Sequence, residues 1–158
     1  MDPSHVLFLV FLIGVIAGLR TMTAPTVVAW AANWHWLNLH NSPLALMGSV
    51  AAVGCFTVLA LGELVVDKLP STPNRTKLLG VIGRSVFGGL SGAAVAASGS
   101  QSIAAGAVLA VAGAIAGAFA GYEIRKRLGR ALNVPDFVIA LCEDALAIGG
   151  GLLIVSRF

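Results

Sequence analysis

At 158 residues the chain has room for one domain, and 58% of its residues are hydrophobic while 11% are charged. Soluble domains carry about 25% charged residues, and a chain this short cannot hide so much apolar surface in its own core. The net charge of +3 comes from short basic loops, without a basic helix face or an aromatic-interleaved strand, which argues against a nucleic-acid partner. We therefore expect one transmembrane domain, residues 1–158, whose solvent is largely membrane lipid.

The first apolar segment is interrupted. An apolar run over residues 6–19 ends at Arg20, and the apolar pattern resumes at Ala24 and continues to Trp36. A span needs about 20 apolar residues, so the first run alone is too short to cross. Pro25 lies inside the longer pattern, which predicts a span broken or kinked between Arg20 and Pro25, with the freed backbone groups bonded by threonine hydroxyls or by neighbours. A re-entrant segment is the alternative.

Four further apolar segments predict an all-α transmembrane bundle of about five spans. They cover residues 42 to about 67, 77–98, 103 to about 122, and 135–158. Ser42 and Pro43 suit a helix start, as an N-cap followed by proline in the first turn.

Glycines mark the faces on which these helices would approach each other. Gly88 and Gly92 are four residues apart, and Gly113, Gly117 and Gly121 repeat at the same interval. Small residues at this spacing let helices in lipid pack closely. Packing within the bundle is one interpretation, and a homo-oligomer interface through the glycine-rich faces is the other.

The basic loops predict an orientation. Lys68, Arg75 and Lys77 follow the second span, and a run of Arg125, Lys126, Arg127 and Arg130 follows the fourth. With five spans both loops fall on one side, which the positive-inside rule assigns to the cytoplasm. The N-terminus is then cytoplasmic, the C-terminus is outside, and Trp30, Trp34 and Trp36 form an interfacial belt on the outer face.

Ionisable residues within membrane spans are costly and mark candidate sites. The candidates for binding a substrate or ion are Arg20, Glu63, Asp67, Lys68, Arg84, Glu143 and Asp144. At ~1.5 Å rise per residue the acids and Arg84 lie within about two turns of the cytoplasmic face, with Arg20 deeper, near the middle. The structural alternative is a set of ion pairs, such as Arg84 with Glu143 and Arg20 with Glu63, that hold the helices in register.

Four stretches together resemble a bacterial inner-membrane protein family of unknown function. They are GLRTMTAP (18–25), ELVVDKLPSTPNRT (63–76), GRSVFGG (83–89) and PDFVIALCEDALAI (135–148), which contain the patterns G-x-R-x-x-x-A-P, E-x-x-x-D-K-x-P and E-D-x-x-A-I. The resemblance covers nearly the whole chain. It implies a small polytopic protein of a bacterial-type inner membrane whose polar motif residues match the seven candidates, and it supplies no activity.

Three functions fit these residues. The first is a permease-like protein with a cytoplasm-facing charged site, in which the acids handle a cation or protons and the arginines hold an anion. The second is an enzyme acting on a lipid phosphate with a divalent cation as cofactor. No P-loop, H-E-x-x-H, G-x-S-x-G or Asp-rich diphosphate motif supports that reading. The third is a non-catalytic membrane scaffold held by structural ion pairs.

Overall fold

The computed structural model describes residues 2–40, 42–66, 78–132 and 135–158, and every regular element in this part of the chain is a helix, without a strand. The elements are α1 (Pro3–Leu19), α2 (Thr23–Asn33), the 3-10 turn η1 (Ala45–Gly48), α3 (Val50–Val66), α4 (Leu78–Ser98), α5 (Ile103–Leu132) and α6 (Asp136–Val155). The predicted all-α fold is confirmed. Asp67 and Lys68 lie outside the described residues.

Three of these helices are long and apolar enough to cross a membrane. They are α4, α5 and α6, with mean hydropathies of 1.5, 2.2 and 2.0, while α1 and α3 are shorter apolar helices. At least a third of the most apolar stretch of each long helix is buried by the other helices, and many of the remaining apolar side chains are exposed, as expected for helices that face lipid. The protein is a helical membrane protein.

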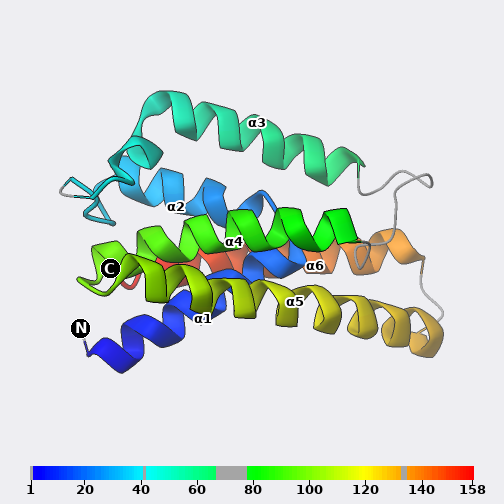
Figure 1. Cartoon of the computed structure of the whole chain (residues 1–158). Helices are drawn as coiled ribbons and strands as arrows, with labels where there is room; N and C mark the ends of the chain where they lie inside the picture. Colours follow the sequence, from blue (N-terminus) through cyan, green and yellow to red (C-terminus); the bar gives the residue numbers. More distant parts are fainter. Residues whose placement is uncertain (1, 41, 67–77, 133–134) are drawn as a thin grey trace.

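The first segment is a hairpin rather than a crossing. The start of α1 lies beside the turn between α4 and α5, since a Cβ added at Gly99 would meet Val6. The loop after α2 returns to the same place, where the Asn38 N–H donates a hydrogen bond to Ser98 Oγ at 3.0 Å. Figure 1 shows α1 running into the bundle and α2 running back. The alternative of a re-entrant segment is therefore the one observed.

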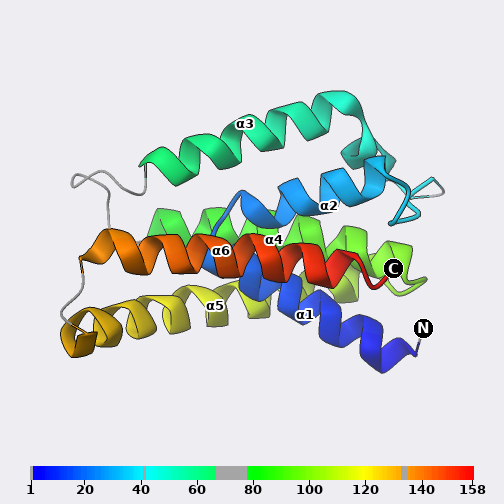
Figure 2. The same ribbon diagram turned by 180° about the vertical axis from the view of Figure 1, so that it is seen from behind.

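The hairpin bears on the expected topology. Both termini lie at one end of the bundle in two opposite views (Figures 1 and 2), and Phe158 contacts the same Gly99 position as Val6. The sequence predicts termini on opposite sides of the membrane, and a hairpin in place of the first crossing would remove one passage, so their orientation across the membrane stays a prediction. We call the end of the bundle that holds both termini the terminal end. The end where α5 stops and α6 starts is the basic end.

The glycine-rich faces pack inside the chain. A Cβ at Gly113 would collide with the backbone of Phe11, and one at Gly117 with the backbone of Val15, both on α1. On α4, a Cβ at Gly92 would collide with Ala110 of α5. At these glycines α1, α4 and α5 pack closely against each other. The glycine-rich faces of α4 and α5 are therefore covered by helices of the same chain, which agrees with the interpretation of packing within the bundle.

Helix α3 lies at the edge of the bundle. Val53 is the buried residue of α3, and the helix packs mainly on α2 and η1. Figure 1 shows it on the outer side of α2. Two side-chain hydrogen bonds join the pair along their length: Thr26 Oγ1 lies 2.9 Å from the Phe56 carbonyl oxygen, and Trp30 Nε1 donates to Thr57 Oγ1 at 3.0 Å. Helix α3 is therefore held to the bundle mainly through α2, while α2 itself is buried against α6, α4 and α1.

Candidate functional site

The site is built around the tip of the hairpin, residues 20–22, where the backbone leaves the helix between α1 and α2. Arg20 is extended, with φ −138° and ψ 113°, and its N–H still bonds the Ile16 carbonyl at 2.9 Å. Pro25 falls in the first turn of α2, where a missing N–H costs nothing. The break predicted between Arg20 and Pro25 is confirmed, and it exposes the N–H groups of Thr21 and Met22, immediately before α2, to side chains of other helices.

Glu63 of α3 bonds these exposed N–H groups. Its Oε1 accepts from the Thr21 N–H at 2.8 Å, and its Oε2 accepts from the Met22 N–H at 2.7 Å. Met22 is the N-cap residue of α2 and has no side-chain cap of its own. A carboxylate at a helix N-terminus satisfies open donors and meets the positive end of the helix dipole. Glu63 is thus a capping group supplied by another helix. The backbone groups freed at the break were expected to bond threonine hydroxyls or neighbouring residues, and Glu63 is such a neighbour.

Arg20 is completely buried at the tip, and its guanidinium forms an ion pair with the carboxylate of Asp144 on α6. The contact places the Arg20 guanidinium beside Asp144, about eight residues into the 20-residue α6 and therefore near the middle of that helix. Helix α1 is 17 residues long, which carries its end about 25 Å into the bundle.

Two further charged residues flank this pair. Glu143, next to Asp144, lies 3.6 Å from Arg125 of α5, measured between Oε2 and Nη1. Arg84 of α4 is 5% exposed and follows Gly83, where an added Cβ would lie 3.9 Å from Thr21 Cγ2. Five of the seven predicted residues therefore gather around the tip: Arg20, Glu63, Arg84, Glu143 and Asp144.

Arg125 is the residue that sequence reasoning missed. It was assigned to the loop after a span ending near Tyr122, but α5 continues to Leu132 and brings Arg125 beside Glu143. Glu123 and Arg127, four residues apart and joined by a hydrogen bond of 2.9 Å, support the helix beyond Tyr122. This i, i+4 pair was the available signal that the helix is longer than its apolar stretch.

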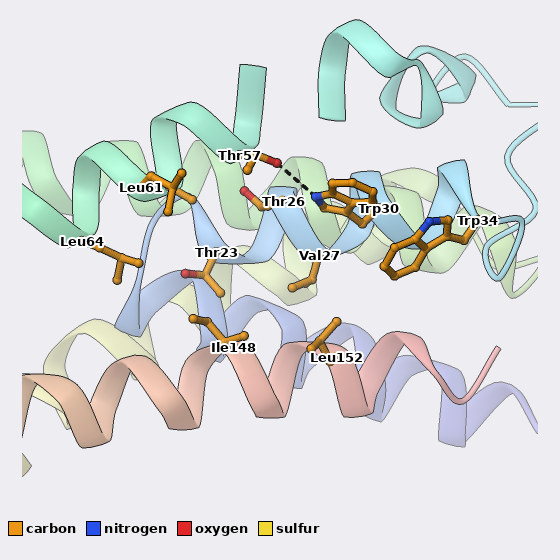
Figure 3. A pocket seen from close by; sticks show the side chains of 11 residues that line it. Thr23, Thr26, Val27, Trp30, Trp34, Thr57, Leu61, Leu64, Ile148 and Leu152 are labelled. Carbon is orange, nitrogen blue, oxygen red and sulfur yellow. Dashed lines mark hydrogen bonds between the residues drawn. The ribbon is translucent and has the colours of Figure 1, made fainter. Parts of the chain in front are cut away.

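An apolar cavity of about 280 Å³ adjoins the tip, between α2, α3 and α6 (Figure 3). Leu61 and Leu64 enter it from α3, and Ile148 and Leu152 from α6 (Figure 3). Its polar groups are the Thr23 and Thr26 hydroxyls and the bonded pair of Trp30 and Thr57. Thr23 is the first residue of α2, so the cavity reaches from the tip toward the tryptophans at the terminal end.

In the described part of the chain, no three His, Cys, Asp or Glu side chains are placed to hold a metal ion together. Carboxylates still occur in the cluster, but Glu63 bonds backbone N–H groups and Asp144 pairs with Arg20. The residues that the structure brings together are therefore ion pairs and a helix cap rather than a preformed ligand set.

The fold and this charged tip define a small helical membrane protein with a re-entrant first hairpin. The chain matches a family described as a domain of unknown function (DUF4126) over residues 7–156, and it belongs to that family. The match covers nearly the whole chain, as the motif resemblance implied. Comparison with curated proteins and with solved structures gave no match.

Proposed function

We propose that this protein is a small permease that binds an ion or a small anionic solute at the hairpin tip. The observation that supports the proposal best is the broken, re-entrant hairpin, with a buried arginine and two backbone N–H groups at its tip that bind a carboxylate. Irregular backbone at membrane depth is tolerated where it is enclosed by protein or lines a cavity, and transporters place their binding sites at such broken helices.

The capping contact suggests how an anion would enter. Glu63 occupies the two N–H groups that an anionic solute would accept hydrogen bonds from, at the positive end of α2. Because α3 packs mainly on α2 and η1, it can move away from the tip at a smaller cost than the central helices. Solute and Glu63 would then alternate on the same donors, with Arg20 and Arg84 close by.

Among the described residues, the charges around the tip balance. They are three arginines, Arg20, Arg84 and Arg125, and three carboxylates, Glu63, Glu143 and Asp144. Adding an anion to a balanced cluster inside a membrane is costly unless a cation or a proton binds with it. We therefore expect the solute to move together with a cation or proton, which the displaced Glu63 or the pair of Glu143 and Asp144 would take up.

A thermal-shift screen of the purified protein tests for this site. A ligand that binds the folded state raises the melting temperature in a concentration-dependent way. The screen would use phosphate, small carboxylates and halides, each with Na⁺ or K⁺ and at two pH values. We expect a hit whose apparent affinity rises in Glu63→Gln, because the neutral amide competes less strongly for the two N–H groups, and stays unchanged in Glu123→Gln, which removes an exposed carboxylate paired with Arg127. A panel without any hit, or a hit whose affinity Glu63→Gln leaves unchanged, would contradict the proposal.

The scaffold reading is the second candidate, and the ion pairs favour it. Arg20 with Asp144 and Arg125 with Glu143 link α1 to α6 and α5 to α6. If these pairs act only to hold the helices in register, replacing both members of a pair by apolar residues of similar volume preserves the protein and its interactions. Retained stability in such a double variant, together with no solute binding or flux by the wild type, would select the scaffold role.

A further inference from the structure

The hairpin tip already holds a carboxylate, and its geometry indicates which kind of anion fits there. The two oxygens of Glu63 accept hydrogen bonds from two successive backbone N–H groups, Thr21 at 2.8 Å and Met22 at 2.7 Å. Successive N–H donors of this kind suit a carboxylate, which has one oxygen for each donor. A solute carboxylate that takes the place of Glu63 therefore finds both of its oxygens bonded.

The apolar cavity between α2, α3 and α6 begins beside this contact. Thr23, which follows Met22 on α2, and Leu64, which follows Glu63 on α3, both line it. Figure 3 shows these two side chains toward one end of the cavity and Trp34 at the other. A solute whose carboxylate lies at the tip therefore has an apolar space next to the rest of the molecule.

Thr23 offers a polar group at this end of the cavity. The residue is 6% exposed and lies in the lining, and no hydrogen bond joins its hydroxyl to another described residue. The other hydroxyls of the lining are bonded: Thr26 Oγ1 donates to the Met22 carbonyl at 2.6 Å, and Thr57 Oγ1 accepts from Trp30. A buried hydroxyl without a partner is costly unless a ligand or water bonds it. Thr23 is therefore placed to bond the polar end of a ligand.

The rest of the cavity suits an apolar tail. Leu61 and Leu152 line it from α3 and α6, and the rings of Trp30 and Trp34, with centroids 4.9 Å apart, line its far part. Thr23 and Trp30 are seven residues apart on one helix, which corresponds to about 10 Å. Because such walls offer few hydrogen-bond partners, they favour hydrocarbon over polar groups. The extended chain of octanoate has a length that fits this space.

We propose that the solute is an amphiphilic carboxylate whose apolar tail lies in the cavity between α2, α3 and α6. Its carboxylate lies on the Thr21 and Met22 N–H groups, Thr23 Oγ1 donates a further hydrogen bond to it, and the tail points toward Trp30. This inference rests on the proposed function, since Glu63 must leave the two N–H groups before a solute can bind them. Each methylene group buried in the cavity should tighten binding about fourfold.

Quenching of tryptophan fluorescence by bromine tests the ligand class and its orientation. The purified protein in detergent would be titrated with 2-bromooctanoate and 8-bromooctanoate, and thermal shifts would give apparent affinities for acetate, octanoate and octanol. We expect octanoate to bind at least about tenfold more tightly than acetate, and more tightly than octanol. 8-Bromooctanoate should quench more strongly than 2-bromooctanoate, because its bromine lies at the end of the tail near Trp30. Thr23→Val should weaken octanoate binding about tenfold.

Phenylalanine variants separate the cavity from the surrounding detergent without adding a tryptophan. Ala60→Phe fills the cavity from α3, and Ile148→Phe is a second filling variant, on α6. Ala51→Phe adds the same side chain at an exposed position of α3 outside the lining, and is the matched control. The filling variants should bind acetate as the wild type does but lose the preference for octanoate and the quenching by 8-bromooctanoate. The control should keep both.

The outcomes distinguish this inference from the function on which it rests. Equal affinities for acetate and octanoate, or quenching that both filling variants leave unchanged, overturn the amphiphilic solute while the anion site at the tip stands. Octanol that binds as tightly as octanoate, or quenching that is equal for the two bromine positions, overturns the assigned head and tail. A wild-type protein that binds neither these carboxylates nor the other anions of the screen contradicts the proposed function, and this inference with it.

Discussion

The guanidinium of Arg20, at the end of α1, forms an ion pair with the carboxylate of Asp144 on α6, and Arg20 has no exposed surface. These residues are 124 positions apart, from 20 to 144, so the pair closes the bundle between its first and last helices. Removing one member of a buried pair leaves an uncompensated charge.

We expect Asp144→Asn to destabilise the protein by about 3–5 kcal/mol, because Arg20 would lose its counter-charge inside the bundle. Thermal unfolding in a mild detergent, with Glu123→Gln as the exposed control, measures this effect. The double variant Arg20→Met with Asp144→Leu should recover most of the lost stability. An unchanged melting temperature in Asp144→Asn would show that the pair is not buried in the membrane-embedded protein.

Replacing Glu63 by Gln should loosen the hairpin tip. The amide keeps the size of the carboxylate, but it has one acceptor oxygen in place of two and no charge for the end of α2. We expect a loss of about 0.5–2 kcal/mol, the range for helix caps. Hydrogen exchange of the Thr21 and Met22 amides should become faster than in the wild type. Exchange at these two amides that stays unchanged would contradict the capping role.

A pair of glycine substitutions tests the packing of α1 on α5. Gly117→Ala would drive a methyl group into the backbone of Val15 and should cost about 1–3 kcal/mol. Gly54→Ala on α3 has nothing within 4 Å of the new Cβ and should instead gain about 0.5–1 kcal/mol from helix propensity. The two melting temperatures should therefore move in opposite directions. A harmless Gly117→Ala would mean that α1 does not contact this face.

Cysteine labelling tests the placement of the termini. In a background where Cys55 and Cys142 are replaced by alanine, Ser4→Cys and Ser156→Cys should react with an impermeant maleimide from the same side of the membrane. Arg130→Cys at the basic end should react from the opposite side. Labelling of Ser4→Cys and Ser156→Cys from opposite sides would restore the five-crossing arrangement and rule out the re-entrant hairpin.

The position of the helix break could be predicted from the sequence, but whether the chain then continues across or turns back could not. Pro25 and the short run before Arg20 fix where α1 must end, and the same residues fit either a kinked crossing or a hairpin. The choice depends on contacts between distant segments, such as Val6 at Gly99 and Asn38 at Ser98. Such contacts leave no periodic signal near the break itself.

The charged cluster was predicted as a set, because ionisable residues are rare in these helices. The individual partners were not, since the pairing of Arg20 with Asp144 and of Glu63 with two backbone N–H groups depends on helix rotation and depth. The charged run after Tyr122 predicts a loop at Arg125. The helix in fact continues through this run to Leu132, so charge alone does not mark its end.

Solute flux into proteoliposomes tests the central claim most directly. The protein would be reconstituted in parallel as wild type, Glu63→Gln and Glu123→Gln, and uptake of the anion identified by the thermal-shift screen would be followed with and without a cation or proton gradient. We predict gradient-dependent uptake by the wild type and by Glu123→Gln, and none above empty vesicles for Glu63→Gln. Uptake by Glu63→Gln at the wild-type rate, or none by the well-folded wild type, would contradict a transport site at the hairpin tip.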